Sequence, residues 1–142
     1  MKDTALLIDT NIVLDWLLER QPFADNAERI MEYCINGSLR GYLSVHSLLN
    51  IFYITRKEKS AAERKEILLM LCDWFEIIDV EKSMIISALQ NENWKDLEDG
   101  LQMQSAEQEN LDYIITRDIN DFEHSAVKAL SPEDFLKVFE TF

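Results

Sequence analysis

Carboxylates follow three short apolar segments of this chain. Ala5–Ile8 runs into Asp9, Phe75–Ile78 runs into Asp79, and Tyr113–Thr116 is followed after one residue by Asp118. In an open parallel α/β sheet, residues that follow the strands meet at one edge, where ligands usually bind. Carboxylates gathered at such an edge repel one another, so a fold that keeps them commonly holds a hard divalent cation. The sequence therefore predicts an acidic metal site.

The bulk composition restricts the class of protein. The chain has 142 residues, of which 47% are hydrophobic, and only three glycines and two prolines, which suits a single domain over residues 1–142. The longest apolar stretch, Ile67–Cys72, is much shorter than the roughly 20 residues that span a bilayer. Asp9 interrupts the first apolar run, so the start does not resemble a signal peptide. We expect a soluble, cytoplasmic protein without a membrane segment.

The charge balance limits how this chain can meet a nucleic acid. Its formal net charge of −13 disfavours binding by broad electrostatic attraction, although a metal site can neutralise a substrate phosphate locally. One basic group is present, and its composition is more typical of a solvated helix end: Arg56, Lys57, Lys59, Arg64 and Lys65. Such an acidic chain also suits a basic protein partner.

The chain alternates short strands with longer helices. We predict strands at Thr4–Ile8, Arg40–Leu43, Phe75–Ile78 and Tyr113–Thr116, with a weaker one at Ala126–Leu130. We predict helices at Asn11–Leu18, Phe23–Asn36, Val45–Lys57, Ala61–Trp74, Glu81–Glu92 and Asp96–Glu109, and a last one from Ser131-Pro132-Glu133 onward. Ser44 and Asp79 are placed to cap the helices that follow them. Strands separated by helices pair in parallel, which predicts a three-layer α/β/α sandwich around a parallel sheet of four to five strands.

Three segments, taken in order, resemble a known family. They are Leu7–Asp15 (LIDTNIVLD), Trp94–Gln102 (WKDLEDGLQ) and Tyr113–Phe122 (YIITRDINDF). Together they are similar to the acidic motifs of PIN-domain ribonucleases, and the resemblance covers nearly the whole chain. That family includes the toxins of VapBC-type toxin–antitoxin pairs, which are small proteins that cleave RNA with Mg²⁺ or Mn²⁺.

The resemblance implies roles for individual residues. Asp9, Asp99 and Asp118 would be catalytic residues and metal ligands, with Asp96 beside Asp99 at the i, i+3 spacing as a further ligand. Four more residues would orient these acids: Asn11, Asp15, Thr116 and Asp121. Each acid also has an ordinary structural interpretation, because Asp9 suits a helix cap and Asp96 and Asp99 suit the dipole of a helix start.

One position departs from the family pattern. PIN nucleases usually carry a glutamate on the helix after the second strand, and here Asn50 stands at that place, so the resemblance implies that Asn50 belongs to the catalytic residues. An amide oxygen can coordinate a hard cation or hold a water, but it brings no charge. We therefore expect weaker metal binding. The alternative is a catalytically weakened PIN domain that acts as a protein-binding module.

The resemblance implies metal-dependent hydrolysis of RNA phosphodiester bonds as the reaction. RNA would reach the site as a single strand, and Tyr53 or Trp94 could offer a stacking face, although both are more typical of a core. A basic antitoxin and a homodimer through Phe23–Asn36 and Ala61–Trp74 are the implied partners. A haloacid-dehalogenase-like phosphatase is disfavoured, because that family needs a second aspartate where Asn11 stands.

Overall fold

The sheet of this protein is parallel throughout. The computed structural model describes residues 3–141. Its sheet contains β1 (Ala5–Ile8), β2 (Arg40–Ser44), β3 (Glu76–Ile78), β4 (Tyr113–Ile115) and β5 (Ala129–Leu130), in the order β3-β2-β1-β4-β5. In register, Leu6 of β1 lies beside Gly41 on one side and Tyr113 on the other. The predicted parallel α/β fold is confirmed.

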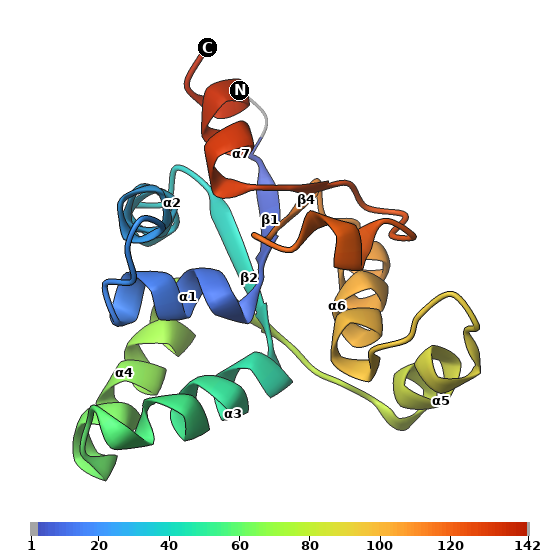
Figure 1. Ribbon diagram of the computed structural model, residues 1–142, viewed down its shortest axis with the longest axis horizontal. Helices are drawn as coiled ribbons and strands as arrows, with labels where there is room; N and C mark the ends of the chain where they lie inside the picture. Colours follow the sequence, from blue (N-terminus) through green and yellow to red (C-terminus); the bar gives the residue numbers. More distant parts are fainter. Residues whose placement is uncertain (1–2, 142) are drawn as a thin grey trace.

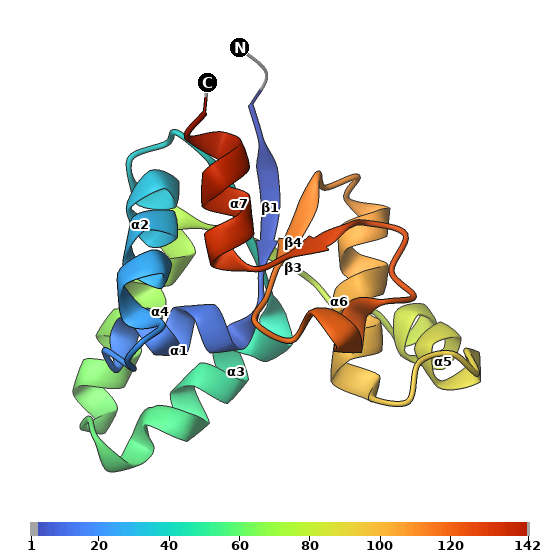
Figure 2. The same cartoon turned by 45° about the horizontal axis from the view of Figure 1, so that its top comes forward.

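Helices cover both faces of this sheet. Within the described residues they are α1 (Thr10–Leu17), α2 (Ala24–Ile35), α3 (Val45–Ile54), α4 (Ala61–Trp74), α5 (Lys82–Gln90), α6 (Leu97–Gln108) and α7 (Pro132–Phe139), with 3-10 turns η1 (Thr55–Lys57) and η2 (Ile119–Phe122). Figure 2 shows α1, α2, α4 and α7 on one side of β1, with α6 on the other side and α5 outside it. No helix in residues 3–141 is long and apolar enough to cross a membrane.

The core lies on both sides of β1, because successive strand residues point to opposite faces. Leu6 and Ile8 pack on the side of α1 and α2, whereas Leu7 packs on the side of α6. All three side chains are fully buried. A strand buried on both faces is typical of a parallel sheet between two helical layers. The position of Asp9, which follows Ile8, is therefore fixed by a fully buried strand.

Most element boundaries lie within two residues of those predicted from the sequence, and the exceptions have local causes. The helix expected over Val45–Lys57 ends in the 3-10 turn η1, and the strand expected over Ala126–Leu130 is reduced to β5, which pairs with only two residues of β4. Ser44 occupies the predicted N-cap position of α3, but Asp79 is not the cap of α5. Ser44 makes no capping bond because its hydroxyl bonds Ser47 Oγ at 3.0 Å, and α5 begins after Glu81 instead of Asp79.

Candidate functional site

The candidate site lies where the direction of strand addition reverses. From β1 the chain adds β2 and then β3 on one side, and it returns to place β4 on the other side of β1. Connections leaving β1 and β4 therefore diverge at the carboxyl edge of the sheet and leave a crevice between them. Asp9 directly follows β1, and Asp118 follows β4. In Figure 1 the start of α1 and the lower part of α6 lie on either side of this edge.

Asp9 is buried in this crevice, with 6% of its surface exposed. Its Oδ1 accepts a hydrogen bond from Gln102 Nε2 at 2.8 Å, and its Oδ2 accepts one from Thr116 Oγ1 at 2.8 Å. It occupies the N-cap position of α1 but makes no side-chain capping bond, so capping does not explain its burial. Burial raises the pKa of Asp9, and the nearby charge of Asp118 raises it further. Two neutral donors orient this carboxylate without balancing its charge.

The segment after β4 is fixed over the start of α1. Thr116 Oγ1, which donates to Asp9, also accepts the backbone N–H of Asp118 at 3.0 Å. Asn11 Nδ2 donates to Asp118 Oδ2 at 3.2 Å. The structure thus brings together Asp9, Asn11, Thr116 and Asp118, which the sequence analysis had grouped, and two of these residues orient the carboxylates of the other two.

Asp99 approaches the same point from the first turn of α6. Its pKa is raised to about 7, first by burial and then by the charges of Asp96, Asp9, Asp121 and Glu98. Asp96 is the N-cap of this helix, and its Oδ1 accepts the Asp99 N–H at 3.0 Å. Asp96 therefore has a structural role here in addition to the charge that it places next to Asp99.

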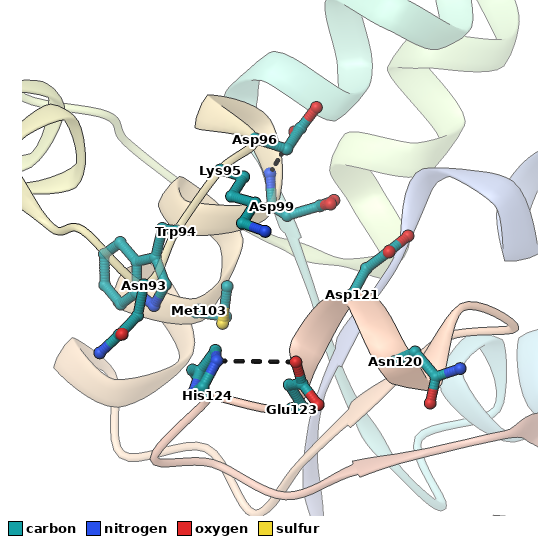
Figure 3. Close-up of a pocket in the computed structure, with 10 residues that line it drawn as sticks. All are labelled: Asn93, Trp94, Lys95, Asp96, Asp99, Met103, Asn120, Asp121, Glu123 and His124. Atoms are coloured by element: carbon teal, nitrogen blue, oxygen red, sulfur yellow. Dashed lines mark hydrogen bonds and ion pairs between the residues drawn. The ribbon is translucent and has the colours of Figure 1, made fainter.

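A cavity of about 240 Å³ opens beside Asp99. Figure 3 shows Asp99 and Asp121 at one end of it and Trp94 and His124 toward the other. Trp94 packs closely against α6. A side chain at Gly100 would not fit beneath it, since its Cβ would lie 2.9 Å from Trp94 Cε3. The cavity therefore extends the acidic crevice toward an aromatic and imidazole wall.

Asn50 lies at the opposite side of the crevice, on α3. Its Nδ2 donates to Glu98 Oε1 at 2.8 Å. Glu98 is half-buried, and its pKa is raised by burial first and then by the charges of Asp9 and Asp96. Sequence reasoning missed both Glu98 and Gln102. Their i, i+4 spacing on the helix that carries Asp99 is the signal that could have indicated them.

Asp15 does not touch these acids. Its carboxylate is fully buried and accepts hydrogen bonds from Arg117 Nε at 2.7 Å and Nη2 at 3.2 Å, with Arg20 Nη1 at 3.9 Å. Arg117, also missed in the sequence, lies between Thr116 and Asp118. Asp15 can therefore influence the site only through the position of this segment.

The two aromatic residues considered as stacking faces differ in their surroundings. Tyr53 is 61% exposed on α3, where the Arg56 guanidinium lies 3.8 Å from its ring centroid, so its expected place in a core is wrong. Trp94 is partly buried against two small apolar clusters. In the basic group, Arg64 is not a free surface charge, because it packs over the Phe52 ring and donates to the Phe52 carbonyl at 2.8 Å.

The chemistry of these donors suits a hard divalent cation. As they stand, no three acidic, histidine or cysteine side chains in residues 3–141 are arranged to hold one ion. Two other observations favour the fit. The acids converge against their own repulsion, and Gln102 Oε1 is buried beside Asp9 with no hydrogen-bond partner in the described part of the chain. Carboxylate and amide oxygens are the ligands that Mg²⁺ and similar cations accept.

Comparisons with known proteins concern the family and the fold of this chain. A family model described as PIN domain matches residues 5–120. No curated protein matches the chain in sequence. Among solved structures, the chain is similar to a toxin–antitoxin complex from Klebsiella pneumoniae, with TM-score 0.67 and 20% identity over 89% of this chain and 97% of that one.

Two further solved structures are similar. VapBC2 from Rickettsia felis, bound to a DNA fragment from its promoter, matches with TM-score 0.62 and 18% identity over 90% of this chain and 98% of that one. VapBC-1 from nontypeable Haemophilus influenzae matches with TM-score 0.67 and 14% identity over 92% and 99%. At these identities the likeness concerns the fold.

Proposed function

The chain belongs to the PIN-domain family, and on this basis we propose that it is a metal-dependent ribonuclease that hydrolyses RNA phosphodiester bonds. Family membership confirms the resemblance carried by the three acidic segments. The observation that carries the proposal is Asp9, a buried carboxylate close enough to Asp99 and Asp118 for their charges to interact, while both of its side-chain hydrogen-bond donors are neutral. A cation that binds there would relieve this repulsion.

Asp9, Asp99 and Asp118 would hold Mg²⁺ or Mn²⁺. Such an ion, when bound, lowers the pKa of a coordinated water and stabilises negative charge on a phosphate. The chain's own contribution is orientation. Gln102 and Thr116 fix both oxygens of Asp9, and Asn11 fixes Asp118 across the crevice.

Further residues line the approach to these carboxylates. Asp96 and Asp121 lie around the cavity beside Asp99 and add negative charge there. Single-stranded RNA suits this opening, because its unstacked bases can lie on an aromatic wall such as the one that Trp94 forms.

Cleavage of a single-stranded RNA by the purified protein in Mn²⁺ tests the proposal. Asp9→Asn and Asp99→Asn should each abolish cleavage, because each removes a charged oxygen ligand. Glu107→Gln is the matched control, since Glu107 is an exposed acid at the far end of α6. Cleavage by either Asp variant at the rate of the parent protein would show that these roles are wrong.

We also propose that the protein is the toxin of a type II toxin–antitoxin pair, neutralised by a basic antitoxin. The similar solved structures are toxin–antitoxin complexes, and a net charge of −13 favours a basic partner. Large apolar side chains exposed by 61–69% offer contact area on α3, α4 and α5: Leu49, Tyr53, Leu69 and Leu89. A homodimer through Phe23–Asn36 and Ala61–Trp74 would share only the exposed part of α4 with this surface.

Growth and sedimentation measurements test this second part. Expression of the chain alone should stop growth, co-expression with the product of the neighbouring gene should restore it, and Asp99→Asn should not stop growth at all. Sedimentation of the purified protein tests the homodimer. A protein that binds its partner but cleaves no RNA in Mg²⁺ or Mn²⁺ would instead be the protein-binding module for which Asn50 argues.

A further inference from the structure

We propose that Glu98 is a carboxylate ligand of the metal centre and that Asn50 positions it. In this arrangement α6 supplies the charge that Asn50 cannot supply from α3. The inference rests on the proposed function, since it concerns the same cation.

The first observation is the contact itself. Asn50 Nδ2 donates to Glu98 Oε1 at 2.8 Å, and this bond joins the second turn of α3 to the first turn of α6 across the crevice. An amide nitrogen only donates, so it holds a carboxylate in place without neutralising it. Asn50 is therefore suited to orient an acid that another charge must balance.

The second observation is that α3 has a fixed position relative to Asp9. Thr10, the residue after Asp9, donates from Oγ1 to Ser47 Oγ at 2.8 Å, and Ser47 Oγ lies 3.0 Å from Ser44 Oγ. These hydroxyl groups are buried. Asn50 lies one helical turn after Ser47, so this network sets where the Asn50 amide, and with it Glu98, stands relative to Asp9.

The third observation is the environment of the Glu98 side chain. A glutamate in the first turn of a helix is favoured by the helix dipole, and that explains its presence. It does not explain why the side chain is half-buried and close enough to Asp9 to be affected by its charge. Within residues 3–141 no ion pair involves Glu98. The carboxylate is therefore held by Asn50 on α3, within the electrostatic influence of Asp9, with no basic partner among these residues.

Gln102 supplies an independent sign of a ligand at this point. It lies four residues after Glu98 on α6 and is fully buried. Its Nε2 donates to Asp9, and its Oε1 has no hydrogen-bond partner among the residues described. A cation with coordinated water beside Asp9 and Glu98 would give that oxygen a donor, because bound water donates strongly.

Manganese titration of the purified protein tests the proposal, with the thermal unfolding temperature and calorimetric heat as readouts besides cleavage. Glu98→Gln keeps the shape and the bond to Asn50 but removes the charge, and it should weaken Mn²⁺ binding at least tenfold. Asn50→Ala should weaken Mn²⁺ binding less than Glu98→Gln does, by about tenfold at most, which is the low end of the loss typical of residues that orient ligands. Glu107→Gln should bind Mn²⁺ as the parent does.

An exchange variant makes the test sharper. Asn50→Glu combined with Glu98→Gln returns the acid to α3 and keeps an amide–carboxylate contact between the two helices, so it should recover most of the Mn²⁺ affinity lost in Glu98→Gln. Recovery supports both roles. A loss in Glu98→Gln without recovery in the exchange variant would support the ligand role of Glu98 and overturn the positioning role of Asn50.

Two outcomes separate this inference from the proposed function. If Glu98→Gln binds Mn²⁺ as tightly as the parent while Asp9→Asn does not, Glu98 is a helix-dipole residue, and the inference fails while the metal site stands. If the parent protein itself shows no response to Mn²⁺ or Mg²⁺ in unfolding temperature or heat, the proposed function fails, and the inference fails with it.

Discussion

Asp9 and Asp15 are both buried aspartates, six residues apart, and their surroundings are opposite. Asp15 receives two hydrogen bonds from one guanidinium, that of Arg117, at 2.7 and 3.2 Å. Asp9 receives two from the neutral groups of Gln102 and Thr116, and its pKa is raised by burial first and then by the charge of another carboxylate, Asp118. A buried charge with a matched partner supports the fold, whereas one without such a partner is typical of a functional site.

The two aspartates are also connected through one short segment. Arg117, the partner of Asp15, lies between Thr116, which bonds Asp9, and Asp118. The ring of Phe23 lies 3.9 Å from the Arg117 guanidinium carbon and shields the pair on one side. The Asp15–Arg117 ion pair therefore holds in place the segment that carries Thr116 and Asp118, which belong to the acidic site around Asp9.

The largest expected effect separates the two aspartates directly. Asp15→Asn should lower the free energy of unfolding by about 3 kcal/mol, the low end for breaking a buried ion pair, because Arg117 keeps some contact with water. Asp9→Asn should leave the metal-free protein as stable as the parent or slightly more stable, because it removes one member of a repulsive group. Urea unfolding in EDTA measures both. Equal losses would show that Asp9 is a structural residue.

Metal should stabilise the protein through the acidic site around Asp9 and not through the Asp15–Arg117 pair. With Mn²⁺ at a hundred times its dissociation constant, the parent should gain about 2.7 kcal/mol in free energy of unfolding, because the ion binds only the folded cluster. Asp9→Asn should gain much less. Asp15→Asn should keep most of the gain despite its lower starting stability. Addition of EDTA must reverse every gain, and an equal gain in Asp9→Asn would place the ion elsewhere.

The pH dependence of stability should reflect Asp99. Its pKa is raised to about 7 in the folded protein from 3.8, so between these pH values the folded state binds a proton that the unfolded state has lost. This contribution makes stability fall as pH rises from about 4 to about 7. The shift corresponds to about 4 kcal/mol, and solvent screening of a half-buried group reduces it to about 1–2 kcal/mol.

Unfolding of the parent and of Asp99→Asn in EDTA from pH 4.5 to 8 isolates this contribution. The stability of Asp99→Asn relative to the parent should increase with pH and level off above pH 7. Parallel curves for the two proteins would mean that Asp99 titrates normally. Since protons compete with metal at this carboxylate, Mn²⁺ binding by the parent should tighten over the same pH range.

The sequence predicts the parts of this site that depend on local pattern. The acids after β1 and β4 meet because the ends of parallel strands share an edge, and Asp99 lies in the first turn of its helix because that turn favours acids. Contacts between distant segments were not predictable in this way. Gln102 reaches Asp9 over 93 residues and Arg117 reaches Asp15 over 102, and both contacts depend on how helices pack on the sheet.

In the fold, too, features set by local sequence were predictable and features set by contacts between elements were not. Alternating strands and helices fix a parallel sheet, and the apolar pattern of Ala5–Ile8 places β1 correctly. The length of β5 was not predictable, because it is limited by pairing with Ile114 and Ile115 of β4 and not by its own composition. Ser44 likewise occupies the N-cap position of α3, but its hydroxyl bonds the Ser47 hydroxyl, which also accepts a hydrogen bond from the distant Thr10, and makes no capping bond.

The smallest expected effect concerns the geometry of the Asp15–Arg117 ion pair. Arg117→Lys keeps the positive charge beside Asp15 but loses the bidentate hydrogen bond and the planar packing on Phe23. It should therefore lower the free energy of unfolding by about 1 kcal/mol. That loss is smaller than the loss expected for Asp15→Asn, because charge balance is retained. Mn²⁺ binding should change little, since Thr116 and Asp118 keep their own hydrogen bonds. Urea unfolding and manganese titration of the same variant check both statements. A large loss of Mn²⁺ affinity without a large loss of stability would show that the Arg117 geometry sets the positions of the acids. The Asp15–Arg117 pair would then be part of the metal site around Asp9.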